Sequence, residues 1–253
     1  GFIYTCALSD PNLSESLSEV KKLNALGKNI LLTGVDDFGQ KNNYGDREQQ
    51  WIAGVRTDSR LIDIDVGPHD FINVLDGERG RIFQYDRDSN LVTIFGGMGA
   101  QAGLFYKPAA IESAGDDVLV LDQGKNSLTV FMPNEYGGLV RRAIADQNSG
   151  QFDSALEKWQ SALRYNANSE LANAGVGRML MQQEKYREAM TYLKQGQDRQ
   201  GYSKAYRFYR AEMVAQFFPL LVAGVLLVLA YALARPRIKA AVYAKTGKGP
   251  KIK

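Results

Sequence analysis

Residues 150–166, GQFDSALEKWQSALRYN, recur in altered form in residues 184–193, EKYREAMTYL. The aligned pairs, each 34 residues apart, are Phe152 and Tyr186, Ala155 and Ala189, and Trp159 and Leu193. A period of 34 residues is typical of stacked helix–turn–helix units. The alanines let two helices approach closely, and the aromatic residues before them fill the gap to the neighbouring helix. The large residues four positions later continue the same face. We expect these six residues to pack the repeats together.

This pattern resembles the tetratricopeptide repeat, and the resemblance covers residues 140–197. The sequence departs from the family at Ala167, where a helix-terminating proline would stand, and at Glu184, which replaces Gly150 of the first copy. The resemblance implies two repeats within residues 142–200 and a concave groove for a peptide or a partner helix. Two repeats give a shallow groove, so a rigid spacer is an equal alternative.

The next segment is apolar enough to cross a membrane. Residues 213–234, MVAQFFPLLVAGVLLVLAYALA, contain no charged side chain. A helix of this length rises about 33 Å, which is enough for a bilayer core of roughly 30 Å. The preceding residues 201–212 are rich in Tyr, Phe and Arg, and we expect a helix there that caps the repeats and runs into the span. Membrane lipid is therefore an expected partner.

The charge distribution orients this span. Residues 235–253 contain seven cations and no acid, whereas the rest of the chain contains 24 cations and 28 acids. The positive-inside rule places this basic tail in the cytoplasm and residues 1–212 outside the plasma membrane of a single-pass protein. The tail is expected to lie against anionic head groups. A mildly acidic body argues against a nucleic-acid partner.

A second repeat, with a period of 46 residues, lies in the first half of the chain. The aligned pairs are Val74 and Val120, Leu75 and Leu121, Asp76 and Asp122, Ile82 and Leu128, and Tyr85 and Phe131. Short alternating apolar runs between Gly, Asn and Asp predict antiparallel strands. A period in the forties with several strands is typical of a propeller blade. The shared position of Asp76 and Asp122 predicts a turn-forming role.

These strands resemble NHL-type β-propellers over residues 1–141, with about three blades. Closed propellers have four to eight blades, so we expect further blades upstream of Gly1. Some propellers are calcium-dependent lactonases, and Asp63 and Asp65 are candidates to line one face. The turn-forming and structural interpretation of the aspartates is favoured, and the sequence predicts no metal site and no cofactor.

Residues 35–60 form a polar insertion between the first two blades. Tyr44 and Trp51 are expected to be exposed aromatic residues within it, of the kind that anchor protein partners or stack on sugars. An ordinary loop with a divergent strand is the alternative.

The predicted fold is multidomain: a partial all-β propeller, all-α tetratricopeptide repeats and one transmembrane helix. No GxSxG, Walker, GxGxxG or HExxH motif is present, so an enzyme is not expected. The domain order resembles Gram-positive envelope proteins in which a Yip-type domain often follows the span and which are associated with carbohydrate ABC importers. The resemblance implies a binding or scaffold protein with an envelope protein partner, such as carbohydrate transporter subunits. A membrane-tethered propeller hydrolase, lactonase or lyase, and an envelope signalling or mechanical tether, are the alternatives.

Overall fold

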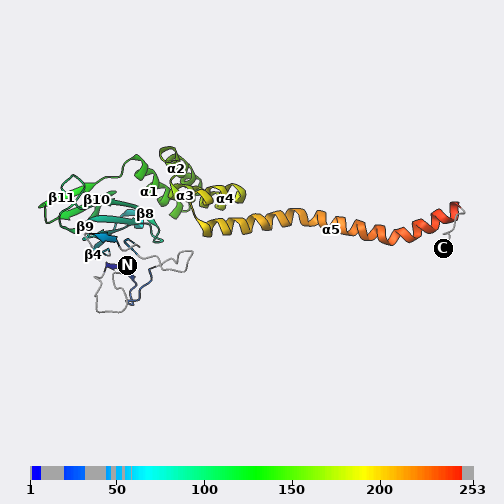
Figure 1. The fold of residues 1–253 in the computed structure, drawn as a ribbon, viewed down its shortest axis with the longest axis horizontal. Coiled ribbons are helices and arrows are strands. Elements are labelled where there is room, and N and C mark those ends of the chain that lie inside the picture. Colours follow the sequence, from blue (N-terminus) through cyan, green and yellow to red (C-terminus); the bar gives the residue numbers. More distant parts are fainter. Residues whose placement is uncertain are drawn as a thin grey trace.

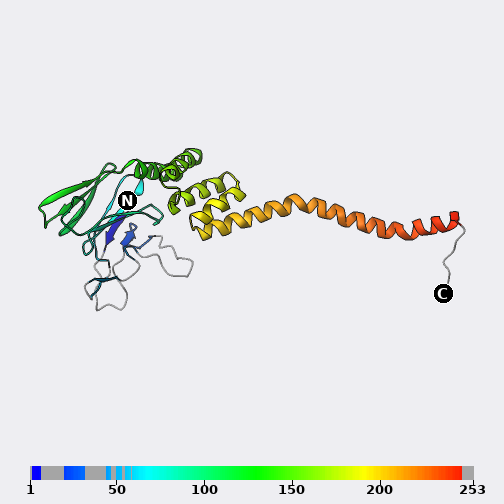
Figure 2. The same ribbon diagram turned by 45° about the horizontal axis from the view of Figure 1, so that its top comes forward.

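The computed structural model describes residues 2–6, 20–31, 44–46, 50–52, 55–57 and 59–246. A β-rich part at one end is followed by a group of short helices, and one long helix projects away from both (Figures 1 and 2). The fold is therefore mixed, with β-strands in the first half of the chain and α-helices in the second half.

Within the described part, the strands form four antiparallel sheets. The two largest are meanders in which each strand pairs with the next along the chain. The first comprises β5 (Leu61–Val66), β6 (Ile72–Asp76), β7 (Arg81–Tyr85) and β8 (Leu91–Gly96). The second comprises β9 (Pro108–Ala114), β10 (Asp117–Asp122) and β11 (Ser127–Phe131). Two hairpins complete the set: β1 (Ile3–Cys6) with β2 (Val20–Leu23), and β3 (Gln50–Ile52) with β4 (Val55–Thr57).

The four-stranded sheet lies between two apolar cores. Val74 of β6 and Phe83 of β7 are buried in a core shared with Val20 of β2. Leu75 and Ile82 are buried in a different core, which contains side chains of β9 and β10. Successive residues of a strand point to opposite faces, so both faces of this sheet are covered. The 46-residue repeat thus corresponds to sheets stacked face to face.

Asp76 and Asp122 terminate equivalent strands, and both are fully buried. Oδ1 of Asp76 accepts hydrogen bonds from the backbone N–H groups of Arg60, Glu78 and Arg79. Asp122 accepts from Tyr106, Gly124 and Lys125, each 46 residues after a donor to Asp76, and also from Lys107. Each carboxylate therefore ties the turn that follows it to the segment before the neighbouring strand. The predicted turn-forming role is confirmed.

Four short helices follow the sheets: α1 (Glu135–Asn148), α2 (Phe152–Tyr165), α3 (Glu170–Gln182) and α4 (Tyr186–Gln195). Consecutive helices pack against each other. The helical part begins at Glu135, before residue 142, where the sequence analysis placed its start. Asn134 sets this start, because its side chain accepts a hydrogen bond from the backbone N–H of Gly137.

The predicted packing residues of the helices differ in burial. Ala155, Trp159, Ala189 and Leu193 are at most 2% exposed. Glycines in α3 make this packing possible: a Cβ on Gly175 would lie 2.5 Å from the Trp159 ring, and one on Gly177 would lie 2.5 Å from Leu193 Cγ. The other two packing residues are less enclosed. Tyr186 stacks on Phe208 with ring centroids 5.3 Å apart, and Phe152 is 36% exposed.

The last helix, α5 (Arg199–Thr246), is continuous from the helical repeats to the end of the described chain. Its 48 residues span about 72 Å. Its first turns pack against α3 and α4. Its apolar part has a mean hydropathy of 2.5 over 18 residues and is not covered by any other part of the described chain. Length and composition therefore make α5 a candidate membrane span.

Candidate functional site

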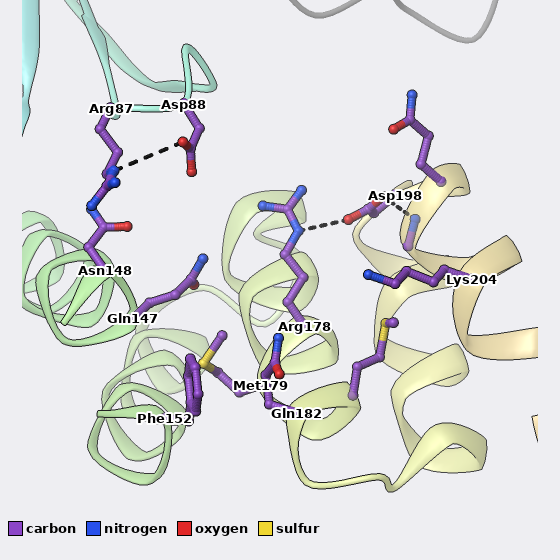
Figure 3. Close-up of a pocket in the computed structure, with 13 residues that line it drawn as sticks. Arg87, Asp88, Gln147, Asn148, Phe152, Arg178, Met179, Gln182, Asp198 and Lys204 are labelled. Atoms are coloured by element: carbon purple, nitrogen blue, oxygen red, sulfur yellow. Dashed lines mark hydrogen bonds and ion pairs between the residues drawn. The ribbon is translucent and has the colours of Figure 1, made fainter. Parts of the chain in front are cut away.

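A polar hollow next to the helices has a volume of about 650 Å³ (Figure 3). It is bounded by the turn between β7 and β8 on one side and by α1, α2, α3 and the start of α5 on the others. The residues that line it are Arg87, Asp88, Gln147, Asn148, Phe152, Arg178, Met179, Met181, Gln182, Asp198, Gln200, Gly201 and Lys204. We call this hollow the helical groove.

Short helices place polar side chains along the helical groove. Gln147 and Asn148 occupy the last turn of α1. Arg178 and Gln182 are four residues apart on α3, so they lie on the same face of that helix. Figure 3 shows Arg178 and Lys204 reaching toward the same space from two different helices.

Two ion pairs order the charged residues of the groove. Arg178 Nε lies 2.9 Å from Asp198 Oδ2, and Asp198 Oδ1 accepts a hydrogen bond from the Gly201 N–H at 2.8 Å. These two contacts hold Arg178 against the first turn of α5. Arg87 and Asp88 form a looser pair at 4.0 Å.

Lys204 gives the groove an excess of one positive charge. Three cations and two acids line it, and two of the cations are in these ion pairs. Lys204 is exposed, and it forms no salt bridge with any residue that the structure describes. Its ammonium group is therefore available to a ligand carboxylate, which would form a charge-assisted hydrogen bond.

Apolar groups lie beside these charges. Phe152 is 36% exposed and Met181 is partly buried, whereas Met179, at 2% exposed, belongs to the core beneath the groove. Methionine side chains are flexible and polarizable, so they adapt to differently shaped apolar partners. Amide, cationic and apolar groups in one hollow suit a polypeptide segment that carries both an acidic and an apolar side chain.

Tyr44 does not form part of an exposed surface. It is 8% exposed, and its hydroxyl donates a hydrogen bond of 2.8 Å to Ser89 Oγ. Its ring also packs on Tyr85, with centroids 4.2 Å apart. Burial raises the pKa of Tyr44 to about 12. The expectation of an exposed partner-binding aromatic at this position is wrong, because Tyr44 fastens the insertion to the four-stranded sheet.

The insertion makes further contacts with that sheet. Asp46 forms ion pairs with Arg79 and Arg81, and the Arg81 pair measures 2.9 Å. The backbone of Trp51 lies in β3, and its side chain lies outside the described part of the structure. Trp51 therefore stays a prediction as a partner-binding residue.

Asp63 and Asp65 connect two sheets. Asp63 Oδ2 accepts a hydrogen bond from the backbone N–H of Ile111 at 2.8 Å, and Asp65 is hydrogen-bonded to the hydroxyl of Ser113. Both partners belong to β9, so the carboxylates hold β5 beside β9. Within the described ranges, no group of three or more His, Cys, Asp or Glu is arranged to hold a metal ion.

Sequence reasoning missed Arg178, Gln182 and Lys204. The aligned repeats covered the second helix of each unit, whereas these side chains lie on α3 and α5. Comparing the first helices at the same 34-residue offset places Arg178 opposite Ile144 and Gln182 opposite Asn148. That comparison would have identified Asn148 and Gln182 as a polar pair of the groove, but it gives no sign of Arg178.

The sequence was also compared with known proteins. It matches no protein-family model and no curated protein.

Proposed function

We propose that this chain is a membrane-anchored binding or scaffold protein, whose helical groove holds a segment of an envelope protein. The helical groove carries this proposal, because it combines Lys204, which has no salt bridge among the described residues, with amide groups and the partly exposed apolar side chain of Phe152 in about 650 Å³. A segment with one acidic and one apolar side chain satisfies all three. Neutral and acidic segments would then differ in affinity through Lys204.

The same proposal assigns the two repeats to known architectures. The four-stranded meander and the 46-residue offset support NHL-type propeller blades. The consecutive packing of α1 to α4 and the 34-residue offset support tetratricopeptide repeats. The domain order makes the permease subunits of a carbohydrate importer the first candidate partners.

The membrane anchor determines where a partner is held. Lys204 precedes the uncharged residues 213–234 by nine positions on the same helix, which corresponds to about 14 Å along its axis. In our proposal the basic tail is cytoplasmic, so the groove lies outside the cell just above the lipid head groups. A partner segment there belongs to a membrane protein or to a protein bound close to the membrane.

Site-specific photocrosslinking tests this proposal. A photoreactive phenylalanine analogue replaces Gln182, which lines the groove, in the full chain produced in its native membrane. The matched control carries the analogue at Gln160, an exposed position on α2 that does not line the groove. We expect one crosslinked membrane protein, identified by mass spectrometry, from the first position only.

A charge reversal tests the ligand chemistry. Lys204→Glu should abolish the crosslink at Gln182, because the introduced carboxylate would repel the acidic side chain of the bound segment. Lys194→Glu, at an exposed position of α4 outside the groove, should preserve it. Equal crosslinking at both analogue positions, or a crosslink that survives Lys204→Glu, would refute the proposed groove ligand.

A further inference from the structure

A second cavity lies between the two large sheets and α1, and it is separate from the helical groove. Its volume is about 310 Å³. Its wall is mostly apolar and comes from both sheets and α1: Val92 and Phe95 of β8, Val118 of β10, Phe131 of β11, and Val140 of α1. Ligand sites are typically apolar cavities of about 300–1,000 Å³ with a few polar groups. We call this cavity the junction cavity.

Arg141 of α1 is the charged group in its wall that is most deeply buried. Its side chain is 10% exposed, and its guanidinium lies 4.9 Å from the centroid of the Phe71 ring. Nη1 donates to the Asp116 carbonyl oxygen at 2.9 Å, and Nη2 donates to Asp116 Oδ1 at 3.2 Å. Nε is buried and has no acceptor within the described part of the chain. An unpaired buried N–H is unfavourable, so this guanidinium is under-satisfied.

Asp116 satisfies the guanidinium only in part. Its side chain is 66% exposed, and its carboxylate contacts one nitrogen of the Nε–Nη2 edge. A guanidinium binds a carboxylate best through two parallel hydrogen bonds from one edge. Burial lowers the pKa of Arg141, while Asp116 and Asp117 raise it. Removal from water thus outweighs the attraction of these neighbours.

We propose that the junction cavity binds a small organic anion, with an aromatic or short aliphatic body and one carboxylate or similar group. The apolar body fills the space between the sheets and α1. Nε is closed to solvent, so the Arg141 side chain rotates to present its Nε–Nη2 edge to the anionic group, and Asp116 turns into solvent. Arg141 thus exchanges one hydrogen bond to the exposed Asp116 carboxylate for two parallel hydrogen bonds to the ligand, inside a cavity that excludes more water.

This ligand would act at the joint between the two parts of the protein. The cavity wall includes both large sheets and α1, which is the first helix of the helical part. A bound molecule contacts all of them and thereby restrains the helical part relative to the sheets. This role is independent of any protein partner in the helical groove.

The test uses the full chain in lipid nanodiscs and 4-(trifluoromethyl)benzoate as the probe, observed by fluorine NMR. The neutral 4-(trifluoromethyl)benzamide serves as the charge control. Thr93→Trp fills the cavity from β8, and Ile94→Trp is its matched control, since Ile94 is exposed and does not line the cavity. Arg141→Gln and Asp116→Asn change the charge.

We expect saturable binding of the benzoate, at least about tenfold tighter than that of the amide. Thr93→Trp should abolish it, and Ile94→Trp should leave it intact. Arg141→Gln should remove the preference for the anion. Asp116→Asn should tighten benzoate binding about two- to fivefold, because it removes an exposed competitor.

Asp116→Asn keeps the test decisive even if Arg141→Gln fails to fold, since Asp116 lies at the surface. The proposal is overturned if the benzoate does not bind saturably or if the benzoate and amide bind equally. Benzoate binding that is unchanged by Thr93→Trp, or that is weakened by Asp116→Asn, also overturns the proposal.

Discussion

Replacing Asp122 by asparagine exchanges one oxygen for an NH₂ group at the end of β10. Oδ1 of Asp122 accepts from the backbone N–H groups of Lys107, Gly124 and Lys125 at 2.8, 2.9 and 3.3 Å. Oδ2 accepts from the Tyr106 N–H at 2.8 Å. The new amide can keep the first three bonds, but its NH₂ group then points at the Tyr106 N–H. Two donors face each other at a buried position.

Asp76 is the matched control for this substitution. It occupies the equivalent position on β6, and its Oδ1 also accepts three backbone N–H bonds. Its Oδ2 has no hydrogen-bond partner within the described residues. Hydrogen bonds to charged groups contribute about 1.5–3 kcal/mol, and neutral ones about 0.5–1.5 kcal/mol. Asp76→Asn weakens three bonds, whereas Asp122→Asn weakens three and loses a fourth, so Asp122→Asn should cost about 2 kcal/mol more.

Pulse proteolysis of the full chain in increasing urea measures both costs, with cleavage followed in the β-rich part. Hydrogen exchange of residues 123–126 provides a local measurement of the same turn. Equal free energies of unfolding for the two variants, or a larger loss in Asp76→Asn, would refute the view that the Tyr106 bond separates the two sites.

The pH dependence gives a second readout of Asp122. Although burial opposes ionisation, the four backbone N–H groups hold the pKa of Asp122 below its ordinary value. A lowered pKa in the folded state stabilises the protein above the unfolded pKa of about 3.9, and this contribution is lost as the pH falls below that value. As the pH falls below about 4, the free energy of unfolding of the Asn variant should therefore decrease less than that of the wild type.

Three further predictions concern packing, the insertion and the span. Gly175→Ala should destabilise the helical part by about 1–3 kcal/mol, measured by thermal melting, because the new methyl group overlaps the Trp159 ring. Tyr44→Phe should cost about 1 kcal/mol in urea unfolding through loss of the bond to Ser89. Since the Tyr44 pKa is raised to about 12, the wild type should also lose stability from pH 10 upward, and the variant should lose less. Leu227→Arg should disfavour membrane insertion by about 2.5–3.5 kcal/mol, seen as a larger fraction extracted by alkaline carbonate.

Local patterns in the sequence predicted the parts of the fold whose causes are local. Alternating apolar residues around Val74 and Val120 indicated strands, and the shared aspartates indicated the turns that follow them. The absence of charge in residues 213–234 indicated a helix that no other part of the described chain covers. In each case, residues close together in the sequence determine the strand, the turn or the helix.

The remaining features depend on contacts between distant residues. Tyr44 is buried because it meets Ser89, which lies 45 positions away, and no pattern in the polar insertion encodes that partner. The start of α1 was missed because Gly137 and Gly138 lower helix propensity near its beginning. Arg178 and Lys204 reach the helical groove from different helices, and only tertiary packing brings them together.

Because α5 is one continuous helix, it fixes the rotation and the distance of the helical groove relative to the apolar segment that we propose crosses the membrane. Each residue of a helix adds about 100° of rotation and 1.5 Å of height. Deleting one residue between Arg210 and Met213 would turn Lys204 by about 100° around the helix axis, so the groove would point in a different direction around the apolar segment. Inserting seven residues there would raise the groove by about 10 Å and return it to within about 20° of its original direction. The distance of the groove from the apolar segment and its direction around the helix axis can thus be varied separately.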